Sequence, residues 1–313
     1  MSYNPDELAD SLRRIAISCM PVEQRVNLGE QSANFREEER HIPYQLKVVH
    51  IDMKRRSVEA NVDKHSFSIK QNEGGNVQVT VSDGTGQSAV CNMPNGLSLN
   101  ESLKKITDYF LGRPGTVIQQ FLISSESVLE TCNVPEMVHQ RYICYDSRNL
   151  EKALVIKCPE TFIFEKTFKS SMIKTVYQQV KNLGFTEKMN IEIGTDGVDP
   201  RVFLTAIEEL KDLNPKLGIQ PKHNCYDIEC SRPNIEYATH LQCLVFDIEG
   251  TELELVVCLP VFVVVPGQER SGLNYITRFN VVKRGTVSNI CRKEDWLSVF
   301  DVEGFVTFVD LTE

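Results

Sequence analysis

The sequence lacks the motifs that identify most nucleotide-, metal- and cofactor-dependent enzymes. It has no phosphate-binding loop that ends in Gly-Lys-Ser or Gly-Lys-Thr, and no dinucleotide fingerprint after a predicted strand. Its histidines are isolated, and none lies in a Gly-x-Ser-x-Gly or His-Glu-x-x-His pattern. His223, Cys225 and Cys230 are the only cluster of soft metal ligands, and they lack the close cysteine pairs of a zinc site. We therefore expect no catalytic residue, no metal site and no cofactor.

The sequence also lacks an excess of positive charge and a long apolar run. Lys and Arg number 34 against 43 Asp and Glu, a formal net charge of -9, so nucleic acid and anionic membranes would on average repel the chain. The longest apolar run, residues 255–266, is too short to span a bilayer. Residues 1–12 have no apolar signal-peptide core, and the ten cysteines are scattered, several within apolar runs. These features predict a cytoplasmic or nuclear protein with free thiols, without a nucleic-acid, membrane or small-molecule partner.

Helical periodicity dominates the first 40 residues. The apolar side chains that carry it are Leu8, Leu12, Ile15, Val26, Leu28 and Phe35. The first three are four and three positions apart, which places them on one helix face, and Pro21 starts one or two further short helices. Two interpretations stay open. These side chains either bind the groove of a protein partner or pack against the chain's own strands.

Residues 41–98 change to the two-residue period of strands. The alternating segments are residues 46–53, 58–62, 67–69 and 77–81. In the first segment the alternation predicts one face made of Leu46, Val48, His50 and Asp52. Turn residues separate the segments, which indicates a small antiparallel meander, and the residues 83–98 are rich enough in Gly, Asn and Ser to predict a loop.

From residue 99 the predicted elements alternate between helix and strand. Helices are expected near Asn100, Phe168 and Asp199, and strands at 120–123, 153–156 and 190–193. The strand centres recur about 35 residues apart, which predicts parallel strands in a degenerate leucine-rich-repeat-like layer. Segments 241–246, 253–259 and 275–282 predict antiparallel strands that close this layer. The expected fold is therefore α+β, with a helical segment over 1–40, a meander and loop over 41–98, and a strand–helix layer over 99–313.

The helical segment resembles an F-box. The resemblance lies in Leu8-x3-Leu12-x2-Ile15, Met20-Pro21-x3-Arg25-x2-Leu28 and Phe35-Arg36. Residues 39–46, 102–113 and 280–286 are in turn similar to a large nematode-specific group, which joins an F-box-like N-terminus to an associated domain of unknown function. An F-box docks on the S-phase-kinase-associated adaptor of a cullin ubiquitin ligase, so the resemblance implies this adaptor as a partner. It implies no activity, cofactor or catalytic residue.

These observations predict a protein–protein interaction protein and not an enzyme. Our first hypothesis is a substrate-receptor-like adaptor, in which the six apolar residues of the helical segment bind the ligase adaptor and the strand–helix layer selects a target. A scaffold or regulatory protein with no ubiquitin-ligase role is an open alternative. A second alternative is a hydrolase whose catalytic residues converge only in the fold.

Overall fold

The computed structural model describes residues 13–20, 22–83, 86–93, 96–134, 136–195, 205, 209–221, 240–258, 275–287 and 290–291. The chain divides into two compact units, Met1–Tyr145 and Asp146–Glu313. The predicted boundaries at residues 40 and 98 both fall within the first unit. Both units mix helices with a mostly antiparallel sheet, so the mixed α and β class expected from the sequence is confirmed.

The first unit begins with short helices and continues into a meander. Residues 13–19 are helical, and the elements that follow are α2 (Val22–Gln31), α3 (Ala33–Glu39), β1 (Gln45–Lys54), β2 (Ser57–Val62), β3 (His65–Gln71), β4 (Val77–Ser82) and β5 (Ser88–Asn92). Each strand from β1 to β5 pairs antiparallel with the next. The predicted meander is thus confirmed, but the loop expected over 83–98 is wrong at its centre. Ser88–Asn92 form an additional strand there, β5.

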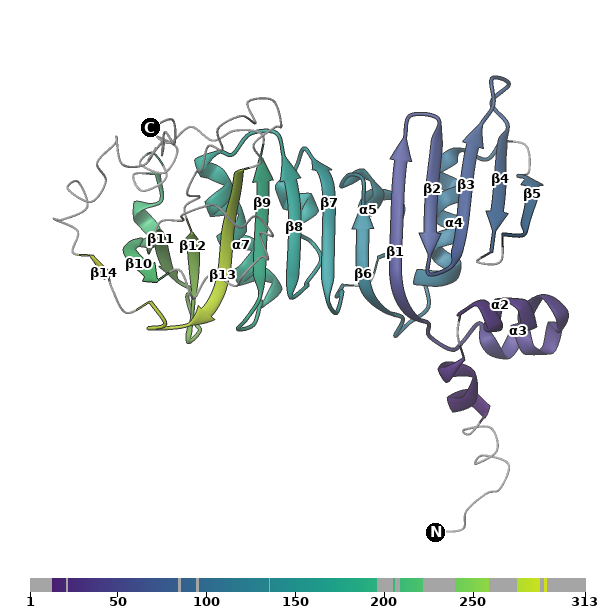
Figure 1. The fold of residues 1–313 in the computed structure, drawn as a ribbon, viewed down its shortest axis with the longest axis horizontal. Coiled ribbons are helices and arrows are strands. Elements are labelled where there is room, and N and C mark those ends of the chain that lie inside the picture. Colours follow the sequence, from purple (N-terminus) through teal and green to yellow (C-terminus); the bar gives the residue numbers. More distant parts are fainter. Residues whose placement is uncertain are drawn as a thin grey trace, which may run out of the picture. The chain divides into compact units, whose positions relative to one another are not determined.

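The rest of the first unit adds parallel strands to the other side of β1. The elements are α4 (Leu99–Leu111), β6 (Val117–Ile123), α5 (Ser127–Thr131) and β7 (Arg141–Ser147). β6 pairs in parallel with both β1 and β7, so the strand order is β7-β6-β1-β2-β3-β4-β5. The helix α4 packs across β2 and β3, as Figure 1 shows, and buries Leu103 and Phe110 against them.

Local sequence signals explain two details of this unit. Ser98 accepts a hydrogen bond from the Glu101 amide while the Glu101 carboxylate accepts one from the Ser98 amide, a capping box that starts α4. In β1 the consecutive amides of Lys47 and Val48 both donate to Asp63 Oδ1, at 2.8 and 2.9 Å. Both amides therefore point to the same side of β1, and the alternation of buried side chains is interrupted there, although the register with β6 continues unchanged. Leu46 is therefore buried while Val48 is exposed, and the face predicted for both is wrong.

The second unit is built around a sheet with the strand order β14-β10-β11-β12-β13-β9-β8. Its elements are α6 (Leu150–Ala153), β8 (Glu160–Glu165), α7 (Ser170–Leu183), β9 (Asn190–Thr195), η1 (Lys211–Leu213), β10 (Lys216–Pro221), β11 (His240–Asp247), β12 (Leu253–Cys258), β13 (Tyr275–Lys283) and β14 (Ile290–Cys291). β8 and β9 are parallel, and the other strand pairs described in this unit are antiparallel. The helix predicted from Phe168 is α7, and the strands predicted at 190–193, 241–246, 253–259 and 275–282 correspond to β9, β11, β12 and β13. The helix predicted from Asp199 lies almost entirely outside the described residues.

The strand predicted at 153–156 is wrong. Asn149 caps a short helix there, because its side chain accepts a hydrogen bond from the Lys152 amide at 3.2 Å. Leu154 and Ile156 are buried in the turn that follows this helix. An apolar run of four residues has no period that separates strand from helix or turn. One of the three strand centres behind the repeat interpretation is thereby removed.

The core of both units is apolar, and it includes cysteines. Cys158 and Cys258, which lie in apolar runs of the sequence, are buried as a small core residue is expected to be. Cys19 and Cys91 are exposed. Within the ranges that the structure describes, no helix combines the length and the apolar character needed to cross a membrane.

Candidate functional site

The helices α2 and α3 form a tight pair at the site predicted for partner binding. Ser32 lies between them and caps α3, because its hydroxyl oxygen accepts a hydrogen bond from the Phe35 amide at 3.2 Å. Arg36 reaches back and donates from Nε to the Gly29 carbonyl at 2.7 Å, which satisfies a carbonyl in the last turn of α2. The two caps come from adjacent stretches of sequence, so this pair is specified locally.

The structure describes four of the six predicted partner-binding residues. Leu8 and Leu12 lie outside the described residues. Ile15 is 58% exposed, and the side chains of Val26, Leu28 and Phe35 are partly buried.

Among the described residues of this segment, the apolar side chains that are buried are instead those of Ile17 and Val22, at 3% and 4% exposure. No pattern in the sequence indicates this, because Ile15 and Ile17 lie on different sides of one helix turn and periodicity cannot tell which side faces the protein.

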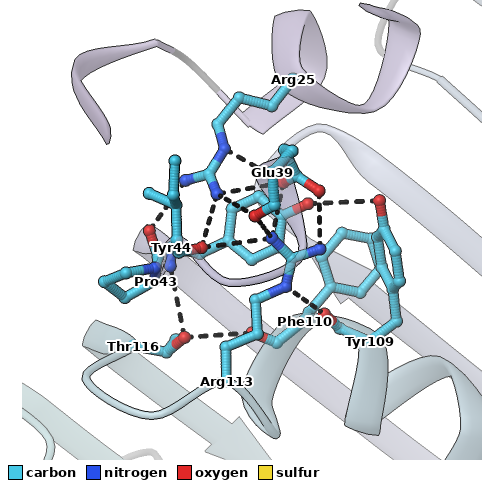
Figure 2. Close-up of polar contacts among 9 residues, drawn as sticks. Arg25, Glu39, Pro43, Tyr44, Tyr109, Phe110, Arg113 and Thr116 are labelled. Carbon is cyan, nitrogen blue, oxygen red and sulfur yellow. Dashed lines mark hydrogen bonds and ion pairs between the residues drawn. The ribbon is translucent and has the colours of Figure 1, made fainter. Parts of the chain in front are cut away.

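A buried cluster of charged residues joins α2 and α3 to the sheet of the first unit (Figure 2). Arg25 Nε donates to Glu39 Oε1 at 3.1 Å. Arg113, which follows α4, binds the same carboxylate with two bonds: Nη1 to Oε1 at 2.6 Å and Nη2 to Oε2 at 2.9 Å. The side chains of Arg25 and Glu39 are each 1% exposed and that of Arg113 is 6% exposed. We call Arg25, Glu39, Tyr44 and Arg113 the arginine clamp.

Two guanidinium groups in the clamp share one carboxylate, so one positive charge needs other partners. Backbone carbonyls supply part of them: Arg25 donates to Pro43 at 2.8 Å and to Ile42 at 2.6 Å, and Arg113 donates to Glu39 at 2.8 Å. The Tyr44 ring supplies the rest, because both guanidinium carbons lie 4.1 Å from its centroid. These contacts satisfy donors that would otherwise be buried without partners.

The clamp holds each group in its ordinary charge state at neutral pH. Burial raises the pKa of the Glu39 carboxyl, but hydrogen bonds from Arg113 and Tyr44 outweigh this and bring the pKa below its usual value. Burial lowers the pKa of Arg25. Burial also acts to lower the pKa of Arg113, but the hydrogen bond to Glu39 and the nearby Tyr44, Glu39 and Tyr109 together outweigh it and raise the pKa. Burial and the hydrogen bond with Tyr109 raise the pKa of Tyr44. The cluster therefore contains a carboxylate, two cations and a neutral phenol.

The chemistry of the clamp is structural. It contains no nucleophile with an adjacent base, and its polar atoms are directed at one another. Sequence patterns do not reveal the clamp, because its members come from distant parts of the chain. One signal was present, since the stretches 20–28, 39–46 and 102–113 that carry the family resemblance contain all four clamp residues.

Other candidate chemistry is sparse in the part of the chain that the structure describes. No group of three or more His, Cys, Asp or Glu residues there could hold a metal ion. The cluster of His223, Cys225 and Cys230 lies outside the described residues. A comparison of the chain with protein-family models, curated proteins and solved structures finds no match.

Proposed function

We propose that this chain is a protein–protein interaction protein that works as a substrate-receptor-like adaptor of a cullin ubiquitin ligase. In this proposal the N-terminal helices bind the S-phase-kinase-associated adaptor. The strand–helix region from residue 99 contacts the protein to be modified. We propose the ligase adaptor as the partner because the helical segment resembles an F-box.

The observation that carries the proposal is the exposure of Ile15, which lies on a helix that contacts α3. Its side chain is 58% exposed, while Arg13 on the same helix pairs with Glu38 of α3 at 3.2 Å. The arginine clamp then fixes α3 to α4 and β1. An exposed apolar side chain on a helix that packs on the protein through Ile17 loses less entropy on binding than one on a free segment, which favours docking into the groove of a partner.

The test is a binding measurement between the purified full chain and the purified ligase adaptor. Ile15→Asp should weaken binding at least about tenfold, because it places a charge in a desolvated contact. The matched control is Val155→Asp, a similarly exposed apolar position in the second unit (46%). Both variants should keep the circular dichroism spectrum and melting temperature of the unmodified chain, since both side chains are already in water.

Deletion of residues 1–40 is a poorer test, because it also removes Arg25 and Glu39 and leaves Arg113 buried without its carboxylate. Absence of binding by the folded full chain, or equal binding by Ile15→Asp and the control, contradicts the proposal. A scaffold with no ubiquitin-ligase role would instead capture other proteins through the same helices and ignore the ligase adaptor.

A further inference from the structure

The strand β5 lies at the end of the first unit's strand order (Figure 1). Among the described strands it pairs with β4 alone, through a continuous register from Ser82↔Ser88 to Gln78↔Asn92. All five of its residues are exposed, and the side chain of Val90 is 59% exposed. The outer edge of β5 is therefore accessible to another strand.

The direction of the backbone groups of β5 follows from the hydrogen bonds at its two ends. The Asp83 amide donates to the Gln87 carbonyl at 3.0 Å, and the Met93 amide donates to the Val77 carbonyl at 2.9 Å. Hydrogen-bonded pairs alternate along an antiparallel ladder, so the odd-numbered residues of β5 bond to β4. The amides and carbonyls of Ser88, Val90 and Asn92 consequently point outward from the sheet. Three donors and three acceptors are thus presented at the spacing of a strand.

The sequence of β5 has none of the features that normally keep an edge strand from pairing. Lysines, prolines and bulges are the usual devices, whereas Ser88–Asn92 has no charged residue, no proline and no break in its register. Its five residues are an ordinary strand length.

We propose that β5 pairs antiparallel with β5 of a second copy of this chain, with a two-fold axis through Val90. This register places Val90 opposite Val90 of the second copy and Ser88 opposite Asn92 of the second copy. It is the one antiparallel register in which all the outward backbone groups of both strands are paired. The dimer does not depend on the proposed ligase role, because it uses a different part of the first unit.

The side chains of β5 are compatible with self-pairing. In this register the residue at position 90 lies on the two-fold axis and meets its own copy, so a charged residue at that position would face a like charge. The strand instead gives a contact between two valines, flanked by two pairs of serine and asparagine. The chain as a whole carries a formal charge of -9, so the two copies repel at long range and added salt should strengthen the dimer.

The short ladder indicates a weak, reversible dimer, because interfaces well below about 1,000 Å² are typical of transient contacts. We expect a Kd on the order of micromolar to 100 µM, measured by sedimentation velocity of the full chain in reducing buffer at several salt concentrations. A chain that stays monomeric up to about 300 µM would overturn the proposal. The same result is expected if β5 pairs only with a strand of a different protein, and that case would also overturn it.

Two variants of Val90 test the place of contact. Val90→Lys puts two like charges across the axis and should raise the Kd about tenfold or more. Val90→Pro removes an outward donor without disturbing the bonds to β4, and should have a similar effect. The matched control is Val155→Lys, at a similarly exposed position in the second unit, which should leave the Kd unchanged, as should Ile15→Asp. Dimers that resist both Val90 variants would contradict the proposal.

Cross-linking tests the register. In a Cys91→Ser background, Val90→Cys places two thiols on residues whose Cα atoms are about 5.5 Å apart, within the range that a disulfide spans. Ser88→Cys in the same background should not cross-link above the level of the parent, because residue 88 of the second copy would be four residues along the strand, about 13 Å away. Equal cross-linking of the two variants would exclude this register and with it the proposed dimer.

Discussion

The clearest quantitative consequence of the structure concerns Glu39. Glu39→Gln keeps the size of the side chain but removes the carboxylate that Arg25 and Arg113 share. The guanidinium groups of Arg25 and Arg113 then remain buried, and only backbone carbonyls and the Tyr44 ring are left to stabilise their charge. Loss of one partner from a buried ion pair costs about 3–5 kcal/mol, and at about 2–4 °C per kcal/mol this lowers the melting transition of the first unit by roughly 6–20 °C.

The assay is thermal and urea unfolding of the full chain, combined with hydrogen exchange of peptides from each unit. The exchange data are needed because two units need not unfold together. The expected result is faster exchange in α3, β1 and α4, with the second unit unchanged. Glu37→Gln is the matched control: its side chain is 69% exposed and pairs with Arg40, and such pairs contribute about 0–1 kcal/mol.

A result in which Glu39→Gln unfolds like Glu37→Gln would refute the reasoning, because it would mean that the negative charge of Glu39 contributes nothing to the stability of the first unit. A further comparison separates charge from packing. Combining Arg25→Met with Glu39→Gln should cost less than the sum of the two single changes, since the second change no longer leaves that guanidinium unpaired.

Two further predictions concern the first unit. Because the pKa of Glu39 is held below its usual value, its contribution to stability is present above the unfolded-state pKa of about 4.3 and is lost as the pH falls through the lower folded-state value. The difference in urea midpoint between the unmodified chain and Glu39→Gln should therefore shrink as the pH falls below the unfolded-state pKa of about 4.3, and a constant difference would contradict this. Ser98→Ala removes the hydroxyl that caps α4 and should lower the free energy of unfolding by about 1 kcal/mol, measured from urea midpoints; no change would show that the cap is not needed once α4 is packed on β2 and β3.

Much of the fold could be predicted because its signals are local. The alternation in residues 46–82 predicted the strands of the meander, and the positions of α4 and α7 followed from apolar spacing. Predictions failed where the local sequence was equally compatible with more than one kind of secondary structure. The segment 153–156 could be strand, helix or turn, and Asn149 decided for a helix. The segment 88–92 is too short for its period to stand out between two turns, and its pairing with β4 made it a strand.

The arginine clamp and the exposure of Ile15 could not be predicted in this way. Arg25, Glu39 and Arg113 are surface residues by composition, and each is expected in water when judged alone. They become buried only because β6 pairs in parallel with β1, which brings the end of α4 beside the end of α3. Likewise, apolar spacing defines the sides of the first helix but not which side meets the protein.

The sequence by itself determined the strands β1 to β4 and the helices α4 and α7, because caps and periodicity act over a few residues. It also determined the absence of recognisable catalytic motifs, and the resemblance that suggests a partner. The tertiary structure alone decided which charged residues share a carboxylate, which isoleucine faces water and which strand is left at the edge. These outcomes depend on pairing between segments far apart in the chain, and no local pattern records that choice.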